Sequence, residues 1–242
     1  MPNLINNTAI HNYKYMKKIF LSIIFLFLLN FNVFSHVEHY KNFNYIEYEL
    51  FRNNNLIGYH KYDFNRNNDE LTVSSDVEFN IKKLNINLYS YSAKSKEIYK
   101  KNNFSSFSSI TNQNKKQKYV NIKFNEEKKL LEIDGSSYKG TASPEFIVGT
   151  WWNHEIINKK AQISAISGRI IEQTVTFIGK EEVLIGDKKY KTLHFNFKSS
   201  DKNLPENKKL NTDIWYEEDT YLWVKAAFDK RGYWEYRIKE YN

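Results

Sequence analysis

The chain has 242 residues, of which 41% are hydrophobic, 17% are aromatic and 26% are charged, and its formal net charge is +8. This length supports one sizeable hydrophobic core. The absence of cysteine excludes disulfide scaffolds, cysteine-ligated zinc sites and thiol nucleophiles, because each of these needs a sulfur atom.

The first 35 residues have the pattern of a short extension followed by a secretory signal peptide. A start at Met16, followed at once by two lysines, precedes an apolar run from Ile19 to Leu29. This run of 11 residues is shorter than the roughly 20 that span a bilayer. We therefore expect translation to begin at Met16, cleavage to follow Ser35, and the mature protein to be periplasmic or secreted.

The mature chain, residues 36–242, is predicted to form a single domain. Cleavage removes three lysines and no acidic residue, so the formal charge falls from +8 to +5. In the whole chain, 31 of the basic residues are lysine and only 5 are arginine. Because proteins that read phosphates and bases rely on the planar arginine fork, we expect no nucleic-acid partner. We also expect no stable membrane span after cleavage.

Apolar and polar residues alternate in several parts of the mature chain, which predicts antiparallel strands with one buried and one wet face. The pattern is clearest from Leu71 to Phe79 and returns over residues 120–124, 192–197, 222–228 and 234–239. Short polar segments between these stretches are typical of turns. A sheet of about 10 to 12 strands curls, so the predicted fold is all-β, with a single antiparallel, strongly curved sheet that forms an open or partly closed barrel.

One segment, residues 141–168, breaks the alternation and is predicted to be non-strand. It contains Pro144, the pair Trp151 and Trp152, and a candidate short helix from Asn153 to Lys160. A segment of this kind between two sets of strands is expected to cover one mouth of the curved sheet or to lie in its concavity.

Four features form a pattern that is shared with a known group of proteins. They are the strand pair Tyr45–Leu50 and Leu56–His60, the central Thr150–Asn153, the later Ile214–Tyr216, and the closing hairpin Trp223–Ile238. With this pattern the chain resembles an uncharacterised family of exported bacterial β-rich proteins, known as a domain of unknown function. The resemblance implies a periplasmic or secreted antiparallel β protein, and it supplies no activity or catalytic residue.

Large aromatic residues beside polar side chains form the candidate ligand-binding site. Two adjacent tryptophans next to an amide and an imidazole can hold a sugar face or an apolar ligand. Two later tryptophans join them, because strict alternation places each on the less apolar face of its strand. The alternative is that these rings fill the barrel, since large aromatics are common in cores. The candidate residues are Trp151, Trp152, Asn153, His154, Trp215 and Trp223.

The leading functional hypothesis is an exported, soluble protein that binds an apolar or lipid-like small molecule in its concave sheet. The chain has no GxSxG, no HExxH and no glycine-rich phosphate loop. The sequence therefore favours a binding protein over an enzyme and predicts no catalytic residue, metal site or cofactor.

Two alternatives from other classes stay open. An envelope polysaccharide hydrolase would need two carboxyl groups about 5 to 10 Å apart beside Trp151 or Trp152. The acidic residues Glu217, Glu218 and Asp219 could supply carboxylates, although adjacent acids in a turn are usually solvated. An outer-membrane β-barrel is the second alternative, because alternation and aromatic residues both allow it.

Overall fold

A computed structural model describes residues 40–84 and 86–242. These residues belong to one compact unit, Ser35–Asn242. The predicted signal peptide, with its start at Met16 and its cleavage after Ser35, lies outside the described residues. In the part of the chain that is described, no helix has the length and apolar character needed to cross a membrane.

The described residues form one sheet of 15 strands and no α-helix. The N-terminal strands are β1 Tyr45–Arg52, β2 Asn55–Asn67, β3 Glu70–Lys83, β4 Ile86–Lys100, β5 Asn103–Gln113, β6 Lys116–Asn125, β7 Leu130–Gly135 and β8 Lys139–Ala142. The C-terminal strands are β9 Ile147–Val148, β10 Ala161–Ile163, β11 Ile170–Ile185, β12 Lys188–Ser199, β13 Asn211–Glu217, β14 Trp223–Asp229 and β15 Tyr233–Tyr241. Two short 3₁₀ helices, η2 His154–Asn158 and η3 Glu206–Lys208, complete the described elements.

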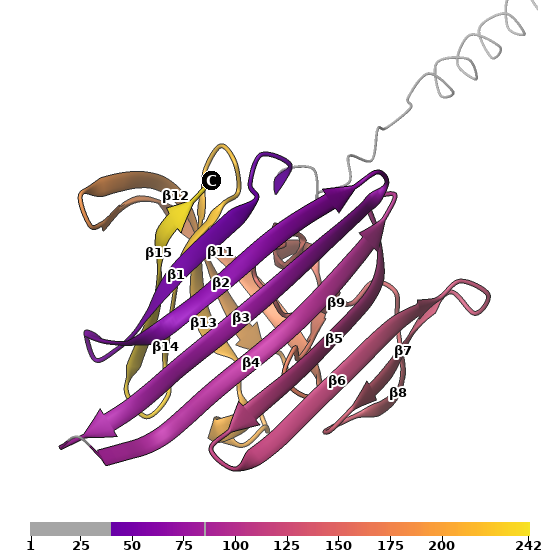
Figure 1. The fold of residues 1–242 in the computed structure, drawn as a ribbon, viewed down its shortest axis with the longest axis horizontal. Coiled ribbons are helices and arrows are strands. Elements are labelled where there is room, and N and C mark those ends of the chain that lie inside the picture. Colours follow the sequence, from indigo (N-terminus) through magenta and orange to yellow (C-terminus); the bar gives the residue numbers. More distant parts are fainter. Residues whose placement is uncertain (1–39, 85) are drawn as a thin grey trace, which may run out of the picture. The chain divides into compact units, whose positions relative to one another are not determined.

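The first and last strands pair at the middle of the sheet. β1 runs antiparallel to β15, with Ile46 opposite Tyr241 and Arg52 opposite Trp234. From this pair, β2 to β8 follow in order on one side and β14 to β9 on the other, and the long N-terminal strands are easily traced in Figure 1. All neighbours are antiparallel except β9 and β10. The two outer strands, β8 and β9, are not paired with each other, so the predicted open barrel is confirmed.

Asparagine supplies the left-handed backbone that tight hairpins need. Asn53 and Asn54, between β1 and β2, have φ of 49° and 62°. Lys101 and Asn102, between β4 and β5, have φ of 46° and 65°. Two successive residues with positive φ form the turn whose twist matches that of the flanking strands, and asparagine tolerates this conformation better than most residues. Both polar segments therefore form tight turns between antiparallel strands.

The sheet encloses two hydrophobic clusters. One joins side chains of β1 to β4 with those of β12 to β15 and includes Trp152 and Ile156. The other lies over β5 to β7 and includes Val148 and Ile163. Residues 141–168 therefore contribute to both clusters, as expected of a segment that lies in the concavity.

The same segment is not wholly free of strands. It contains β9 and β10, each too short to show a period of two in the sequence. The expected helix from Asn153 to Lys160 is the 3₁₀ helix η2, in which Asn153 accepts a hydrogen bond from the Glu155 amide at 3.1 Å. The Lys159 amide donates to the Ile156 carbonyl oxygen at 3.3 Å, which is the three-residue spacing of a 3₁₀ helix.

Candidate functional site

Trp152 is a core residue that anchors the central segment to the N-terminal strands. Its side chain is 1% exposed, and its ring packs edge-on against Phe64 at 5.4 Å and against Tyr99 at 5.8 Å between ring centroids. Its indole Nε1 donates a hydrogen bond to Glu97 Oε2 at 3.0 Å. The Trp152 ring is therefore packed against interior aromatic rings, and its one polar atom has a hydrogen-bond partner inside the protein.

Glu97 on β4 is a buried carboxyl group that the sequence did not single out. It is 2% exposed and accepts hydrogen bonds from the Tyr99 hydroxyl at 2.6 Å, from Trp152 and from the Thr150 hydroxyl at 3.3 Å. Burial raises the pKa of Glu97 to about 7, even though the three donors favour the ionised form. Asn153 Nδ2 donates to the Tyr99 hydroxyl at 3.1 Å and extends this network. The Glu97 carboxyl group is therefore occupied by hydrogen bonds inside the protein.

Trp151 points away from its neighbour because the backbone turns between them. It has φ of 57°, an uncommon value for a residue with a large side chain. Its carbonyl oxygen accepts a hydrogen bond from the Tyr216 hydroxyl at 2.9 Å. Its ring lies 5.4 Å from that of Trp223 and 5.7 Å from that of Tyr236. The paired tryptophans therefore connect the central segment to both halves of the sheet.

His154 is also buried, at 3% exposure, and its ring stacks on Tyr221 at 4.6 Å. Together with the capping residue Asn153 it belongs to the interior contacts of η2. The structure thus brings Trp151, Trp152, Asn153 and His154 into one packed region, where they fill space between strands.

Trp223 and Trp215 lie on opposite faces of the sheet. The pairing of β13 with β14 contains a β-bulge, so that Tyr216 lies opposite Trp223 but Trp215 lies opposite Lys225. Trp223 is fully buried and stacks on Tyr48 at 4.1 Å. Strict alternation placed both tryptophans on the less apolar face, and for Trp223 this expectation is wrong because the extra residue of the bulge turns its side chain inward.

The outer face around Trp215 carries a small polar cluster. The Trp215 ring stacks on His194 at 4.3 Å, and Lys225 Nζ lies 4.8 Å from the ring centroid. The two ring nitrogens of His194 lie 3.0 Å from Glu181 and 3.1 Å from Asp213. Trp215 is therefore separated by the sheet from the other candidate residues.

His60 on β2 is an interior polar residue that sequence reasoning missed. Both of its ring nitrogens are shielded from solvent and have no hydrogen-bond partner among residues 40–84 and 86–242. Its ring lies 4.3 Å from that of Tyr62 and 6.0 Å from that of Tyr236. Burial lowers the pKa of His60 to about 3, because the apolar surroundings disfavour the imidazolium.

An apolar cavity of about 500 Å³ opens between β3–β4 and β14–β15. Phe79 stacks on Tyr91 at 4.7 Å, and Trp234 packs against Phe79 edge-on at 5.3 Å. Burial raises the pKa of Tyr91 to about 12, so its hydroxyl is uncharged at neutral pH. The apolar and aromatic residues that line the cavity are Phe79, Ile81, Leu88, Tyr89, Tyr91, Ile166, Phe228, Trp234 and Tyr236.

Three cationic side chains complete the lining of this cavity. They are Arg52 at the end of β1 and Lys230 and Arg231 in the β14–β15 turn. No acidic residue occurs among the described residues that line it. This site was not predicted from the sequence because its residues come from strands that are far apart in the chain. The alternating pattern around Phe79 and Tyr236 indicated that these side chains face the interior, but it did not indicate a cavity between them.

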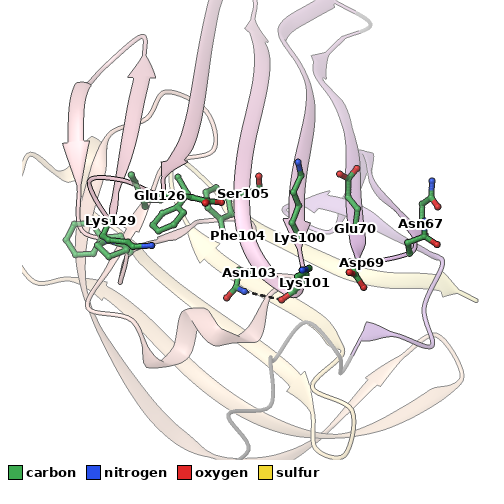
Figure 2. Close-up of a pocket in the computed structure, with 15 residues that line it drawn as sticks. Asn67, Asp69, Glu70, Lys100, Lys101, Asn103, Phe104, Ser105, Glu126 and Lys129 are labelled. Atoms are coloured by element: carbon green, nitrogen blue, oxygen red, sulfur yellow. Dashed lines mark hydrogen bonds between the residues drawn. The ribbon is translucent and has the colours of Figure 1, made fainter.

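A second hollow, of about 960 Å³, lies at the ends of the N-terminal strands. Figure 2 shows the side chains of the β2–β3, β4–β5 and β6–β7 turns around it, with Asn103 Nδ2 donating to the Lys101 carbonyl oxygen at 3.1 Å. Its lining includes acids such as Asp69 and lysines such as Lys129 in equal number. This hollow lacks the uniform apolar lining and single charge sign of the smaller cavity.

The acidic turn 217–219 uses its first carboxylate to hold its own backbone. Glu217 Oε2 accepts hydrogen bonds from the amides of Asp219 at 3.1 Å and Thr220 at 2.7 Å. This is the geometry of a turn cap.

Comparison with known proteins places the chain by family and by fold. Residues 48–239 match a family described as a domain of unknown function, DUF6134. No curated protein matches the chain. A β-barrel-like protein of the domain of unknown function DUF1849 from Brucella abortus superposes with a TM-score of 0.54, at 11% identity, over 82% of this chain and 96% of that one. A DUF1329 family protein from Desulfovibrio piger, at 8% identity over 86% of this chain and 90% of that one, has a TM-score of only 0.19.

Proposed function

Since the chain belongs to the DUF6134 family of domains of unknown function and folds as an open, barrel-like sheet, we propose that it is an exported protein that binds an apolar, lipid-like ligand. The ligand occupies the cavity between β3–β4 and β14–β15. The observation that carries this proposal is the aromatic and aliphatic lining of that cavity.

The size and chemistry of the cavity support a small-molecule ligand. Its volume of about 500 Å³ falls within the range of about 300 to 1,000 Å³ of known small-molecule sites. Rings such as Phe79, Tyr91 and Trp234 hold one another in fixed orientations and so form the walls before a ligand arrives. Each methylene group that the ligand withdraws from water contributes about 0.8 kcal/mol.

Export is the second part of the proposal, and the signal-peptide pattern of residues 16–35 supports it. The full chain is to be expressed in a bacterial host, and the protein is to be recovered from the envelope without detergent and weighed intact. A mature N-terminus at His36 is expected. Retention of the apolar run would contradict cleavage, and appearance only in the detergent-extracted fraction would favour the outer-membrane alternative.

Ligand binding is tested with a neutral fluorescent probe, N-phenyl-1-naphthylamine, and with native mass spectrometry of the recovered protein. The probe is expected to bind in a saturable manner. Replacing Ile81 with Trp puts a large ring in place of a smaller aliphatic side chain in the cavity, and it is expected to weaken probe binding about tenfold or more. The matched control is Ile110→Trp on β5, where the isoleucine is 55% exposed and lies outside the cavity.

Two results would overturn the binding proposal. One is the absence of saturable probe binding to the wild-type protein. The other is equal loss of binding in the Ile81 and Ile110 variants, which would indicate a general effect of the added ring. Circular dichroism shows whether each variant keeps its sheet.

The polysaccharide hydrolase stays a prediction without geometric support near the tryptophans. The carboxyl group that hydrogen-bonds Trp152 belongs to Glu97, which is 2% exposed and already accepts from three donors. A carboxyl group in this position has no access to a polysaccharide in the folded protein.

A further inference from the structure

The cavity mouth gathers positive charge from two elements. Arg52 ends β1, and Lys230 and Arg231 lie in the turn between β14 and β15. Pairing of β1 with β15 places Arg52 opposite Trp234, which brings the arginine to the same end of the sheet as the turn. The apolar lining and the cationic rim are therefore continuous.

The Arg52 guanidinium group is held in place but only partly used. Its Nη2 donates to the carbonyl oxygen of Arg231, and its carbon Cζ lies 5.8 Å from the Trp234 ring centroid. Its Nε is shielded from solvent and has no hydrogen-bond partner within the described ranges, 40–84 and 86–242. A buried donor without a partner is costly unless something outside the protein supplies an acceptor.

The turn that carries the other two cations is also well defined. Trp234 Nε1 donates to the Lys230 carbonyl oxygen at 3.0 Å, and the Lys230 amide donates to the Gly232 carbonyl oxygen at 3.0 Å. None of the ion pairs found among the described residues involves Arg52, Lys230 or Arg231. Like charges without a counterion raise the energy of the empty site and favour a bound anion.

The charge state of Lys230 is consistent with this arrangement. Partial burial lowers the pKa of Lys230, and the positive charges of Arg169 and Arg231 lower it further. An anion at the mouth would raise the pKa of Lys230 again, because its negative charge would stabilise the protonated ammonium group.

We propose that the ligand is an anionic amphiphile, whose acyl chain lies in the apolar cavity and whose carboxylate or phosphate head is bound by Arg52, Lys230 and Arg231. This inference rests on the proposed function and adds the charge of the ligand to it. Arginine suits the role because its planar group forms paired hydrogen bonds to carboxylate and phosphate oxygens.

The test compares ligands that share one chain and differ in the head. Dodecanoate, dodecyl phosphate and dodecanol each compete with N-phenyl-1-naphthylamine for the protein recovered from the envelope. Both anions are expected to bind about tenfold or more tightly than the alcohol. The ratio of the two anions distinguishes a carboxylate head from a phosphate head. The advantage of the anions is expected to shrink as ionic strength rises from about 0.01 M to about 0.15 M.

A matched pair of double variants locates the effect. Lys230→Gln with Arg231→Gln is expected to weaken dodecanoate binding about tenfold and thereby to remove most of the advantage of dodecanoate over dodecanol. Lys115→Gln with Lys116→Gln removes the same charge from the exposed end of the β5–β6 hairpin and is expected to change neither affinity. Because all four residues lie at the surface in or beside hairpin turns, the variants are expected to fold normally.

The outcomes separate this inference from the proposed function. Equal binding of dodecanoate and dodecanol, or equal loss in both double variants, would overturn the anionic head and leave an apolar ligand site. Failure of all three compounds and of the probe to bind would overturn the ligand site itself.

Discussion

Two aromatic regions of the sheet interior differ in how closely they are packed and in how many of their polar atoms have hydrogen-bond partners. Around Trp152, the indole nitrogen, the Glu97 carboxyl group and the Tyr99 hydroxyl all find partners inside the fold. Around Trp234, rings of similar kind border a cavity of about 500 Å³, and Arg52 keeps a shielded nitrogen without a partner. Large aromatics beside charged groups therefore mark either a core or a binding site, and the open space beside them distinguishes the two.

The largest difference between the two regions is expected when each tryptophan is truncated to alanine. Trp152→Ala is expected to lower the free energy of unfolding by about 3 to 5 kcal/mol, because it opens a void in a filled region and removes a donor from Glu97. Trp234→Ala enlarges an existing cavity, so it is expected to lower the free energy of unfolding by clearly less than Trp152→Ala does. Urea denaturation measures both, and equal losses would contradict the distinction between a filled and an open region.

The second prediction concerns the pH dependence that Glu97 confers. Its pKa is about 7 in the folded protein against 4.5 when unperturbed, so the folded state holds the proton more tightly than the unfolded state. The resulting stabilisation is complete below about pH 4.5 and is lost as the pH rises through about 7, a change of about 3 kcal/mol.

Glu97→Gln isolates this contribution, because glutamine keeps the shape of the neutral acid and does not titrate. The difference in unfolding free energy between wild type and variant is expected to change across that pH range. Parallel stability curves for the two proteins would show that Glu97 does not ionise with a raised pKa.

An effect of opposite sign is expected from His60, which contacts Tyr236 of the cavity, and down to about pH 5 it is smaller than that of Glu97. Its pKa is about 3 in the folded protein and 6.5 when unperturbed, so the unfolded state gains the proton first. Stability is therefore lost as the pH falls from 6.5 towards 3, by about 2 kcal/mol down to about pH 5.

His60→Phe keeps a ring in this position and is expected to remove the acid-dependent loss. The direct measurement is an NMR titration of the His60 ring, which should stay neutral down to about pH 4. A midpoint near 6.5 would mean that solvent reaches the imidazole and would refute the assignment.

Much of the fold could be read from local patterns. Residues 71–79 were expected to bury Leu71, Val73, Val77 and Phe79, and all four are less than 9% exposed. Alternation succeeds here because successive side chains of a strand point to opposite faces. The prediction of about 10 to 12 strands fell short of 15 because strands such as β9, with two residues, carry no readable period.

The candidate site was predicted less well. The segment from Trp151 to His154 does lie inside the sheet, but its members pack against the strands. Trp223 was placed on the wrong face because a bulge shifts the register by one residue. The cavity lining was missed because it joins β1, β3, β4 and β15, which the chain brings together only when the first and last strands pair.

The amino-acid sequence was sufficient to predict an all-β protein whose strands have one apolar face and are joined by short polar turns, because these properties depend on residues close together in the chain. Which aromatic rings fill the interior and which border a cavity could not be predicted from these local patterns. That outcome depends on how the two arms of the sheet curve toward each other and on which donors find acceptors across the interior. These are contacts between residues far apart in the chain, and so the satisfied Trp152 and the cavity beside Trp234 became distinguishable only in the folded protein.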